Sequence, residues 1–106
     1  PFKVSVVQNL MVELALSGAR SVARVSQELG LSRRTFQRRL SEHDLTFRDL
    51  VSQVRRDMAQ ALLSNTNLPV QDIAKLLGYK KPGAFARAFV RWTGQSPKGY
   101  RDSGRP

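Results

Sequence analysis

The sequence contains no cysteine, which excludes disulfide bonds and thiolate metal sites and is typical of a reducing compartment. Its single histidine, His43, has no second candidate ligand nearby, so we expect no metal site and no cofactor. No apolar run approaches the length of a membrane-spanning helix, and the first residues do not resemble a signal peptide. A cytoplasmic protein is the expectation.

Acidic residues are scarce: 8 of them stand against 18 basic residues, which gives a formal net charge of +10 and a pI near 11.3. Such a charge points to a polyanionic partner, with nucleic acid first and an anionic membrane surface second. Most of the basic residues are arginines, whose planar guanidinium forms bidentate pairs with phosphate or guanine. The 106 residues can form one small domain, or two lobes that share a core. Because the chain begins at Pro1 and not at Met, we expect it to be a fragment of a longer protein.

The longest helical signal spans Thr46–Ser64, where apolar residues three or four positions apart line one face. Thr46, followed three residues later by Asp49, resembles a capping box and predicts the start of the helix. Asn65 and Pro69 predict its end. Because a smaller helical pattern appears on both sides of this stretch, we expect the helix to connect two equivalent units.

Before this connector the spacing predicts three helices. The first covers about Val4–Ser17 and stops at Gly18, and its low positive charge indicates a role in packing. Ser21 predicts the start of a second, short helix, which Gly30 ends in a left-handed backbone conformation.

The third helix follows its expected N-cap, Ser32, and buries only Phe36 and Leu40. The opposite face is wholly polar and holds Arg34, Gln37, Arg38 and Ser41 at helical spacing. Two short helices joined by a glycine turn, the second with a basic and amide-bearing face, form the helix-turn-helix pattern.

The same pattern recurs after the connector. PVQDIAKLLGY matches SVARVSQELGL with Gly78 placed 48 residues after Gly30. The helix that follows, expected from Pro82 to Thr93, pairs Phe85 with Phe36, which lies 49 residues earlier, so the second turn holds one extra residue. Trp92 shares the spacing of the apolar stripe, and we expect it in the core and not stacked on a base.

Ser96 follows Gly94 in a Gly-Gln-Ser-Pro run that superficially resembles the surroundings of a serine nucleophile. The Gly-x-Ser-x-Gly elbow is not met, so the cap of a last short helix is the better interpretation. No paired acid and base and no phosphate-cradling glycine loop is present, and an enzyme is disfavoured. A non-specific polyanion binder, or a membrane-surface binder, stays open on charge alone.

The chain resembles the DNA-binding domain of AraC/XylS-type bacterial transcription regulators in three segments, ARSVARVSQELGLSRRTFQRRL, DIAKLLGYKKPGAFARAFVRWTG and QSPKGYR. The resemblance covers nearly the whole chain, and the second half is the more specific. It implies an all-α fold of about seven helices. One helix-turn-helix subdomain is expected in residues 1–45, a linker helix in 46–65 and a second helix-turn-helix subdomain in 66–106.

The resemblance also implies a function. Each chain is expected to place two recognition helices in successive major grooves of double-stranded DNA, and to regulate transcription without catalysis. RNA polymerase is a further expected partner. An effector-binding or dimerisation domain is expected on the N-terminal side.

Carried over position by position, the resemblance places Arg34, Gln37 and Arg38 at the base edges, with Arg33 and Thr35 where the helix enters the groove. The chemistry agrees, because arginine pairs with guanine O6 and N7, and glutamine with adenine N6 and N7. A solvated basic face is the alternative, but a helix with only two inward residues has little other purpose in a small domain.

In the second unit the matching residue is Arg87, with Gly83 and Ala84 at the end of the helix that enters the groove. Phosphate contacts are expected from residues that flank the recognition helices or lie on the linker: Ser32, Arg39, Arg48, Arg55, Arg56, Lys80, Lys81 and Arg91. For each of these, and above all for the linker arginines, the alternative is a solvated side chain.

The sequence departs from the family just before the second recognition helix. Where the family usually carries a short polar or acidic capping residue, this chain has Lys81, whose charge opposes the positive end of the helix dipole. Gly83 adds up to about 1 kcal/mol of unfavourable helix propensity. We therefore expect the start of this helix to be frayed until DNA binds, and specificity to rest mainly on the first unit.

Overall fold

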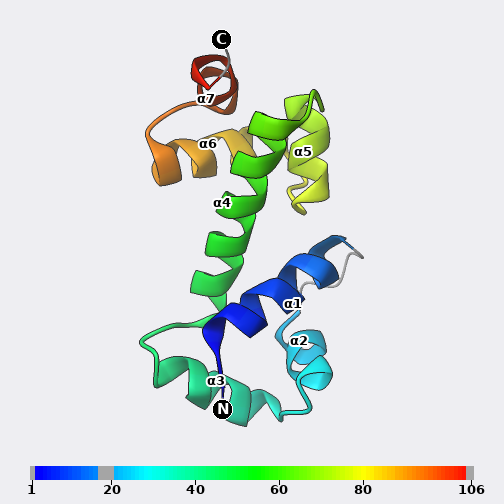
Figure 1. Cartoon of the computed structure of the whole chain (residues 1–106), viewed down its shortest axis with the longest axis vertical. Helices are drawn as coiled ribbons and strands as arrows, with labels where there is room; N and C mark the ends of the chain where they lie inside the picture. The colour runs from blue at the N-terminus through cyan, green and yellow to red at the C-terminus, as the bar shows by residue number, and fades with distance from the viewer. Residues whose placement is uncertain (1, 17–20, 105–106) are drawn as a thin grey trace. The chain divides into compact units, whose positions relative to one another are not determined.

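The computed structural model describes residues 2–16 and 21–104, and within them the chain forms seven α-helices and no β-strand (Figure 1). The expected all-α class is confirmed. The helices are α1 (Val4–Leu16), α2 (Val22–Glu28), α3 (Arg33–Ser41), α4 (Phe47–Asn65), α5 (Val70–Leu76), α6 (Pro82–Thr93) and α7 (Pro97–Ser103). The expected stop of the first helix, Gly18, lies outside the described residues.

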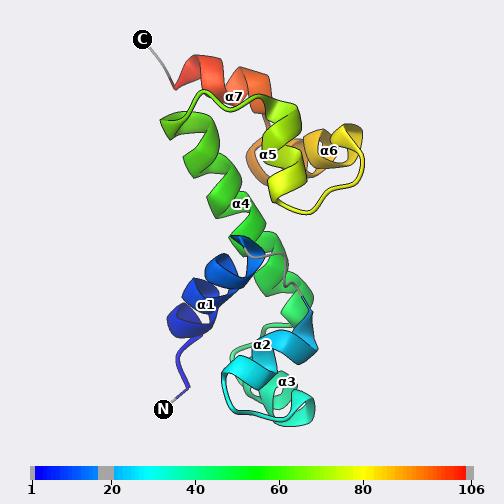
Figure 2. The same ribbon diagram turned by 90° about the vertical axis from the view of Figure 1, so that its right-hand side faces the viewer.

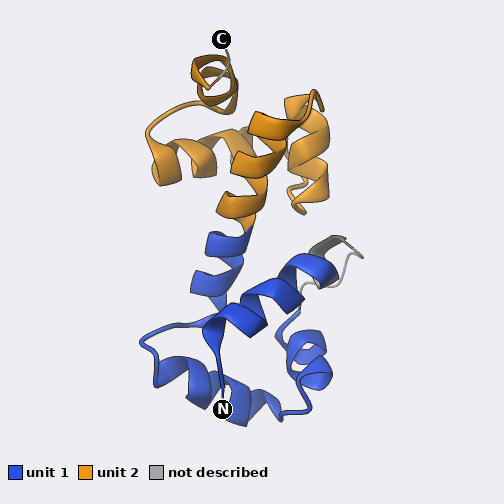
Figure 3. Ribbon diagram, in the orientation of Figure 1, with its two compact units in different colours: residues 1–54 blue, residues 55–106 orange. Residues whose placement is uncertain are grey.

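The chain divides into two compact units, and the boundary between them falls inside α4 (Figure 3). Unit 1 comprises residues 1–54 and unit 2 residues 55–106. Each unit therefore contains one helix-turn-helix pair, α2–α3 in unit 1 and α5–α6 in unit 2, together with part of α4. The separate linker segment at 46–65 stays a prediction about the domain boundaries.

In unit 1, α2 and α3 follow each other across a short turn (Figure 2). Serine side chains set the starts of both helices. The hydroxyl oxygen of Ser21 accepts a hydrogen bond of 3.1 Å from the main-chain N–H of Arg24. The hydroxyl oxygen of Ser32 accepts one of 3.1 Å from the N–H of Thr35. Both expected N-caps are thus confirmed. Apolar side chains from every helix of the unit are buried, namely Val7, Met11, Val25, Phe36, Leu40, Leu50 and Val54.

The turns of the two helix pairs begin with the same geometry. Gly30 and Gly78 adopt left-handed backbone angles, with φ of 71° and 92°. Just beyond Gly30, the N–H of Leu31 donates to the carbonyl oxygen of Ser26 over 2.9 Å. The equivalent bond after Gly78 runs from Tyr79 to Ala74 over 3.0 Å. The internal repeat is therefore also a repeat of structure in the first part of the turn. Beyond it the turn of unit 2 holds the one extra residue that the sequence predicts.

The capping box of α4 is confirmed. The side-chain Oδ2 of Asp49 accepts a hydrogen bond of 2.9 Å from the N–H of Thr46, and the Thr46 Oγ1 accepts one of 3.1 Å from the N–H of Asp49. Each residue therefore satisfies a main-chain donor of the other at the start of the helix.

The core of unit 2 is one apolar cluster that draws on α4, α5 and α6. The rings of Phe85 and Phe89 lie 5.9 Å apart, and Tyr100 of α7 stacks on Phe89 at 5.3 Å. Trp92 packs edge-on against Phe89 at 6.3 Å, which confirms its expected place with the core. α7 begins at the cap that Ser96 forms with the N–H of Gly99 over 2.9 Å. Ser96 is thus a helix cap in the structure.

Candidate nucleic-acid interface

The outward face of α3 is polar because its two apolar residues point into unit 1. Phe36 and Leu40 are 0% exposed. The residues expected at the base edges, Arg34, Gln37 and Arg38, are exposed, as is Arg33. At the N-terminus of the helix the hydroxyl of Ser32 donates to the hydroxyl oxygen of Thr35 over 2.9 Å.

No ion pair among the described residues neutralises the charge of this face. Across residues 2–16 and 21–104, no acidic side chain forms an ion pair with an arginine of α3. The nearest helix, α2, keeps its own pair, between Arg24 and Glu28 at 3.0 Å. α3 therefore presents guanidinium groups that are available for an anionic partner.

α6 lies in unit 2 as α3 lies in unit 1, with its apolar stripe inward. Phe85 and Phe89 are 0% exposed, whereas Gly83 and Arg87 are exposed. Arg87 extends back over the first turn of the helix: a methyl group added at Gly83 would lie 3.3 Å from its Nη1. Ala84, the other residue expected at the groove, is half-buried.

The start of α6 differs from the start of α3. Pro82 occupies the first turn, where its missing N–H costs nothing, but Lys81 forms no side-chain hydrogen bond with the helix. The absence of a side-chain cap agrees with the sequence. The expected fraying stays a prediction.

The residues expected to contact phosphate fall into two groups. Ser32, Arg48, Lys80, Lys81 and Arg91 are exposed. Three arginines are half-buried instead, namely Arg39, Arg55 and Arg56. Each of these three side chains has contacts within its own unit, which compete with a contact to phosphate. The expected phosphate contacts stay predictions.

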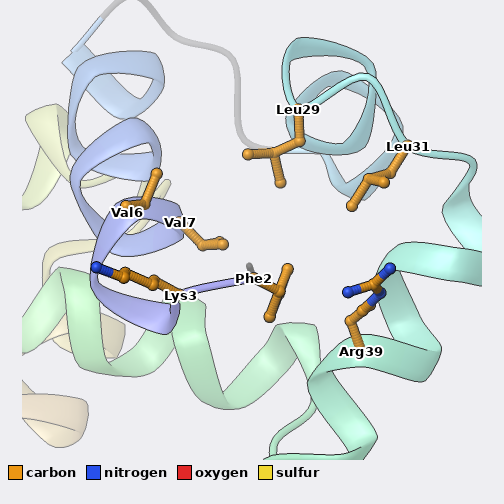
Figure 4. A pocket seen from close by; sticks show the side chains of 7 residues that line it. All are labelled: Phe2, Lys3, Val6, Val7, Leu29, Leu31 and Arg39. Atoms are coloured by element: carbon orange, nitrogen blue, oxygen red, sulfur yellow. The ribbon is translucent and has the colours of Figure 1, made fainter.

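Arg39 extends from α3 toward a pocket of about 400 Å³ in unit 1 (Figure 4). Apolar side chains from α1 and from the turn between α2 and α3 line most of this pocket, among them Val7 and Leu31. Lys3 contributes the second cation. Arg39 therefore lies beside the inward residues of α3 and not on its exposed polar stripe.

Arg55 and Arg56 follow each other on α4 but have different surroundings. The Nε of Arg55 donates to the carbonyl oxygen of Leu77, and its guanidinium lies 4.7 Å from the centre of the Tyr79 ring. Arg56 contacts Asp57 at 3.6 Å, with both side chains substantially exposed, so this pair is weak. Arg56 thus keeps most of its freedom to reach an external anion.

Sequence reasoning gave Arg101 no role, although it belongs to the QSPKGYR segment. In the structure its Nε donates to the carbonyl oxygen of Leu63 over 3.1 Å, and its Nη2 donates to that of Thr66 over 3.3 Å. These bonds satisfy main-chain oxygens at the end of α4 and attach α7 to it. The sequence offered one signal for this role, namely that Arg101 lies in a segment that resembles the family.

The described part of the chain lacks two further kinds of site. No group of three or more His, Cys, Asp or Glu side chains there could hold a metal ion. None of its helices combines the length and the apolar character needed to cross a membrane.

A family model described as a helix-turn-helix domain matches residues 25–103. The matched segment includes both glycine turns and the outward faces of α3 and α6. Together with the geometry, this match defines the class: the chain is a helix-turn-helix DNA-binding domain of a transcription regulator. More closely, it belongs to the AraC-type family of such domains, as the resemblance in sequence implied.

Relatives in sequence are regulators of the same type. The HTH-type transcriptional regulator VqsM of Pseudomonas aeruginosa is 40% identical over 83 residues, which are 78% of this chain and 26% of that protein. VirS of Mycobacterium tuberculosis is 36% identical over 98 residues, or 92% of this chain and 29% of VirS. The chain thus spans about a quarter of the length of the curated relatives that it matches.

Among solved structures, the DNA-binding domain of AdpA, a global transcriptional factor, was determined in complex with a target DNA. It is 30% identical to this chain, with a TM-score of 0.68 over 91% of this chain and 90% of that one. The xylose-binding transcription activator xylR gives a TM-score of 0.85 at 24% identity, covering 100% of this chain and 28% of that one, and supports the fold.

Proposed function

We propose that the domain recognises a specific sequence of double-stranded DNA by placing one recognition helix from each unit, α3 and α6, in successive major grooves. The observation that carries this proposal is the outward face of α3, where exposed arginine and glutamine side chains have no acidic partner among the described residues. A helix inserted into the major groove meets the hydrogen-bonding edges of the bases there.

In unit 1 the proposed base contacts are made by Arg34, Gln37 and Arg38, with Arg33 and Thr35 at the entry to the groove. Arginine supplies bidentate pairing to guanine and glutamine to adenine. In unit 2 the proposed contact is Arg87, with Gly83 and Ala84 allowing the backbone of the first turn to approach the bases closely.

Phosphate contacts would hold each helix in register without reading sequence. The exposed residues that suit this role are Ser32, Arg48, Lys80, Lys81 and Arg91, and Arg56 retains the freedom to join them. For Arg39 and Arg55 the proposed phosphate contact would have to coexist with the contacts that each makes inside its unit.

Within a regulator as long as these relatives, the domain would act in the bacterial cytoplasm, on DNA of the nucleoid, and without catalysis or a cofactor. An effector-binding or dimerisation domain on the N-terminal side and a contact with RNA polymerase complete the proposal. The support for both is that the curated relatives are about three times as long as this chain and are themselves regulators.

Selection of bound sequences from a random DNA pool tests the proposal directly. The domain should enrich one sequence and retain it against excess competitor DNA. Footprinting of the monomer should protect two segments about 10 base pairs apart on one face of the duplex. Because the two units are direct repeats, the site should be asymmetric.

Two variants make the test specific. Arg38→Ala should change the enriched sequence, whereas Arg24→Ala, which alters an exposed arginine on α2, should leave it unchanged. Equal retention of all sequences would contradict the proposal and favour a charge-driven polyanion binder.

A further inference from the structure

The two recognition helices share one core register, so that each outward residue of α3 has an equivalent in α6. Phe36 and Phe85 are both fully buried and lie 49 residues apart. With the same offset, Arg38 corresponds to Arg87. Of the two arginines on the outward stripe of α3, the one at Arg38 is therefore kept in α6, whereas Gly83 occupies the position of Arg34.

Two further differences on this stripe replace hydrogen-bonding groups with methyl groups. At the position of Gln37 in α3, α6 has Ala86, and at the position of Ser41 it has Val90. The amide that would pair with adenine and the neighbouring hydroxyl are thus absent from α6. An apolar surface occupies the same place on the helix.

This apolar surface is partly open to solvent, because Ala86 is half-buried and Val90 is exposed. Ala86 and Val90, with the flanking Arg87 and Arg91, line a shallow hollow on α6, and Val90 is 46% exposed. The guanidinium of Arg87 is directed toward Gly83, one turn nearer the start of the helix, and so away from Val90. Two cations therefore border an uncovered patch of side-chain methyl groups.

From this arrangement we infer that unit 2 recognises the C5-methyl groups of thymine through Ala86 and Val90, beside a guanine bound by Arg87. Thymine is the one unmodified DNA base that presents a methyl group in the major groove, and apolar side chains are what contact it. The flanking arginines match the charge of the phosphates on either side. The inference rests on the proposed function, because it requires α6 to lie in the major groove.

Replacement of thymine by deoxyuridine removes this methyl group and leaves the base pair's hydrogen bonds intact. The test starts from the sequence that the domain selects, in which the positions relaxed by Arg87→Ala mark the half-site of unit 2. Each thymine of that half-site is replaced in turn by deoxyuridine, and the dissociation constant is measured. At one or two positions we expect affinity to fall about two- to fivefold, the effect of burying one methyl group.

Variants at position 90 show whether the Val90 side chain causes the loss of affinity for deoxyuridine sites. Val90→Ala and Val90→Ser should weaken binding to the thymine site and lose most of the deoxyuridine penalty, whereas Val90→Thr, which keeps one methyl, should retain part of it. Val6→Ala is the matched control, because Val6 is 53% exposed but lies on α1. Arg87→Ala should lower affinity for thymine and deoxyuridine sites by the same factor.

The outcomes separate this inference from the function on which it rests. A specific site whose unit 2 half contains no thymine, or tolerates deoxyuridine everywhere, overturns the inference and leaves specific binding standing. A deoxyuridine penalty that Val90→Ala does not reduce overturns it as well. If the domain selects no sequence at all, the proposed function fails and the inference fails with it.

Discussion

The Nε of Arg55 donates a hydrogen bond of 3.1 Å to the carbonyl oxygen of Leu77, the residue that caps the end of α5. The same guanidinium lies over the ring of Tyr79, two residues further on. One side chain of α4 thus holds the turn that leads into the second recognition helix. An arginine that charge alone would assign to DNA also has a structural task.

This arrangement predicts that Arg55→Lys destabilises unit 2 by about 1–2 kcal/mol, because an ammonium cannot reproduce the planar donor above the ring. Urea unfolding followed by the fluorescence of Trp92, the single tryptophan, measures the effect within unit 2. Arg48→Lys, at an exposed position of the same helix, should change stability by less than about 0.5 kcal/mol. Equal effects of the two substitutions would show that the Arg55 contacts contribute little.

A second prediction concerns ionic strength. The net charge of +10 and the exposed basic side chains beside both recognition helices should make phosphate contacts the main source of affinity. If about six to ten phosphates are neutralised, the logarithm of affinity should fall against the logarithm of salt concentration with a slope of about −5 to −9. Titrations at several salt concentrations give this slope, and a value near zero would rule out a phosphate-dominated interface.

The third prediction separates base contacts from phosphate contacts. Arg38→Ala should cost about 1–3 kcal/mol of binding free energy and relax the preference at one or two base positions. Arg56→Ala should weaken binding to all sequences alike, because a phosphate contact carries no sequence information. Competition between site variants measures both effects, and the same pattern for the two mutants would mean that the outward face of α3 does not read bases.

Much of the fold could be predicted because its signals are local. The serine caps and the Thr46–Asp49 pair lie within three residues of the groups that they bind, and Gly30 marks a left-handed turn by its residue type. Asp44 also has a positive φ, of 57°. Because aspartate usually has a negative φ, its residue type did not indicate a left-handed conformation there.

The contacts that sequence reasoning missed are distant along the chain. Arg55 binds a carbonyl oxygen 22 residues away, and Arg101 binds one 38 residues away. Their targets are main-chain oxygens, which every residue has, so no residue type at the far end signals the contact. The same holds for Arg39, whose direction depends on the packing of α1 against the helix pair. Residue charge alone could not distinguish the arginines that point to solvent from those that make contacts within the fold.

The fourth prediction concerns the start of α6. Ser32 caps α3, whereas Lys81 provides no side-chain cap to α6. Lys81→Ser should therefore stabilise the free domain by about 0.5–1 kcal/mol. Lys80→Ser removes the same charge outside the cap position and should lack this gain, while both variants weaken non-specific DNA binding.

Amide hydrogen exchange decides whether the start of α6 is frayed. The amides from Gly83 to Phe85 should exchange quickly in the free domain and slowly on DNA, where phosphate supplies the negative charge that the missing cap does not. Strong protection of these amides without DNA would contradict this prediction. It would also remove the reason to expect specificity to lean on unit 1.

The shared core register of α3 and α6 means that the outward residues of one helix can be transferred to the other without altering a buried position. Three substitutions would give α6 the outward stripe of α3: Gly83→Arg, Ala86→Gln and Val90→Ser. The new arginine would stand four residues before Arg87, as Arg34 stands four residues before Arg38. Such a variant should select a tandem repeat of a single half-site. If each helix reads its own half-site, as proposed, substitutions in one helix would change one half of the target sequence and keep the other. Such a domain could then move to a new target sequence in two separate mutational steps.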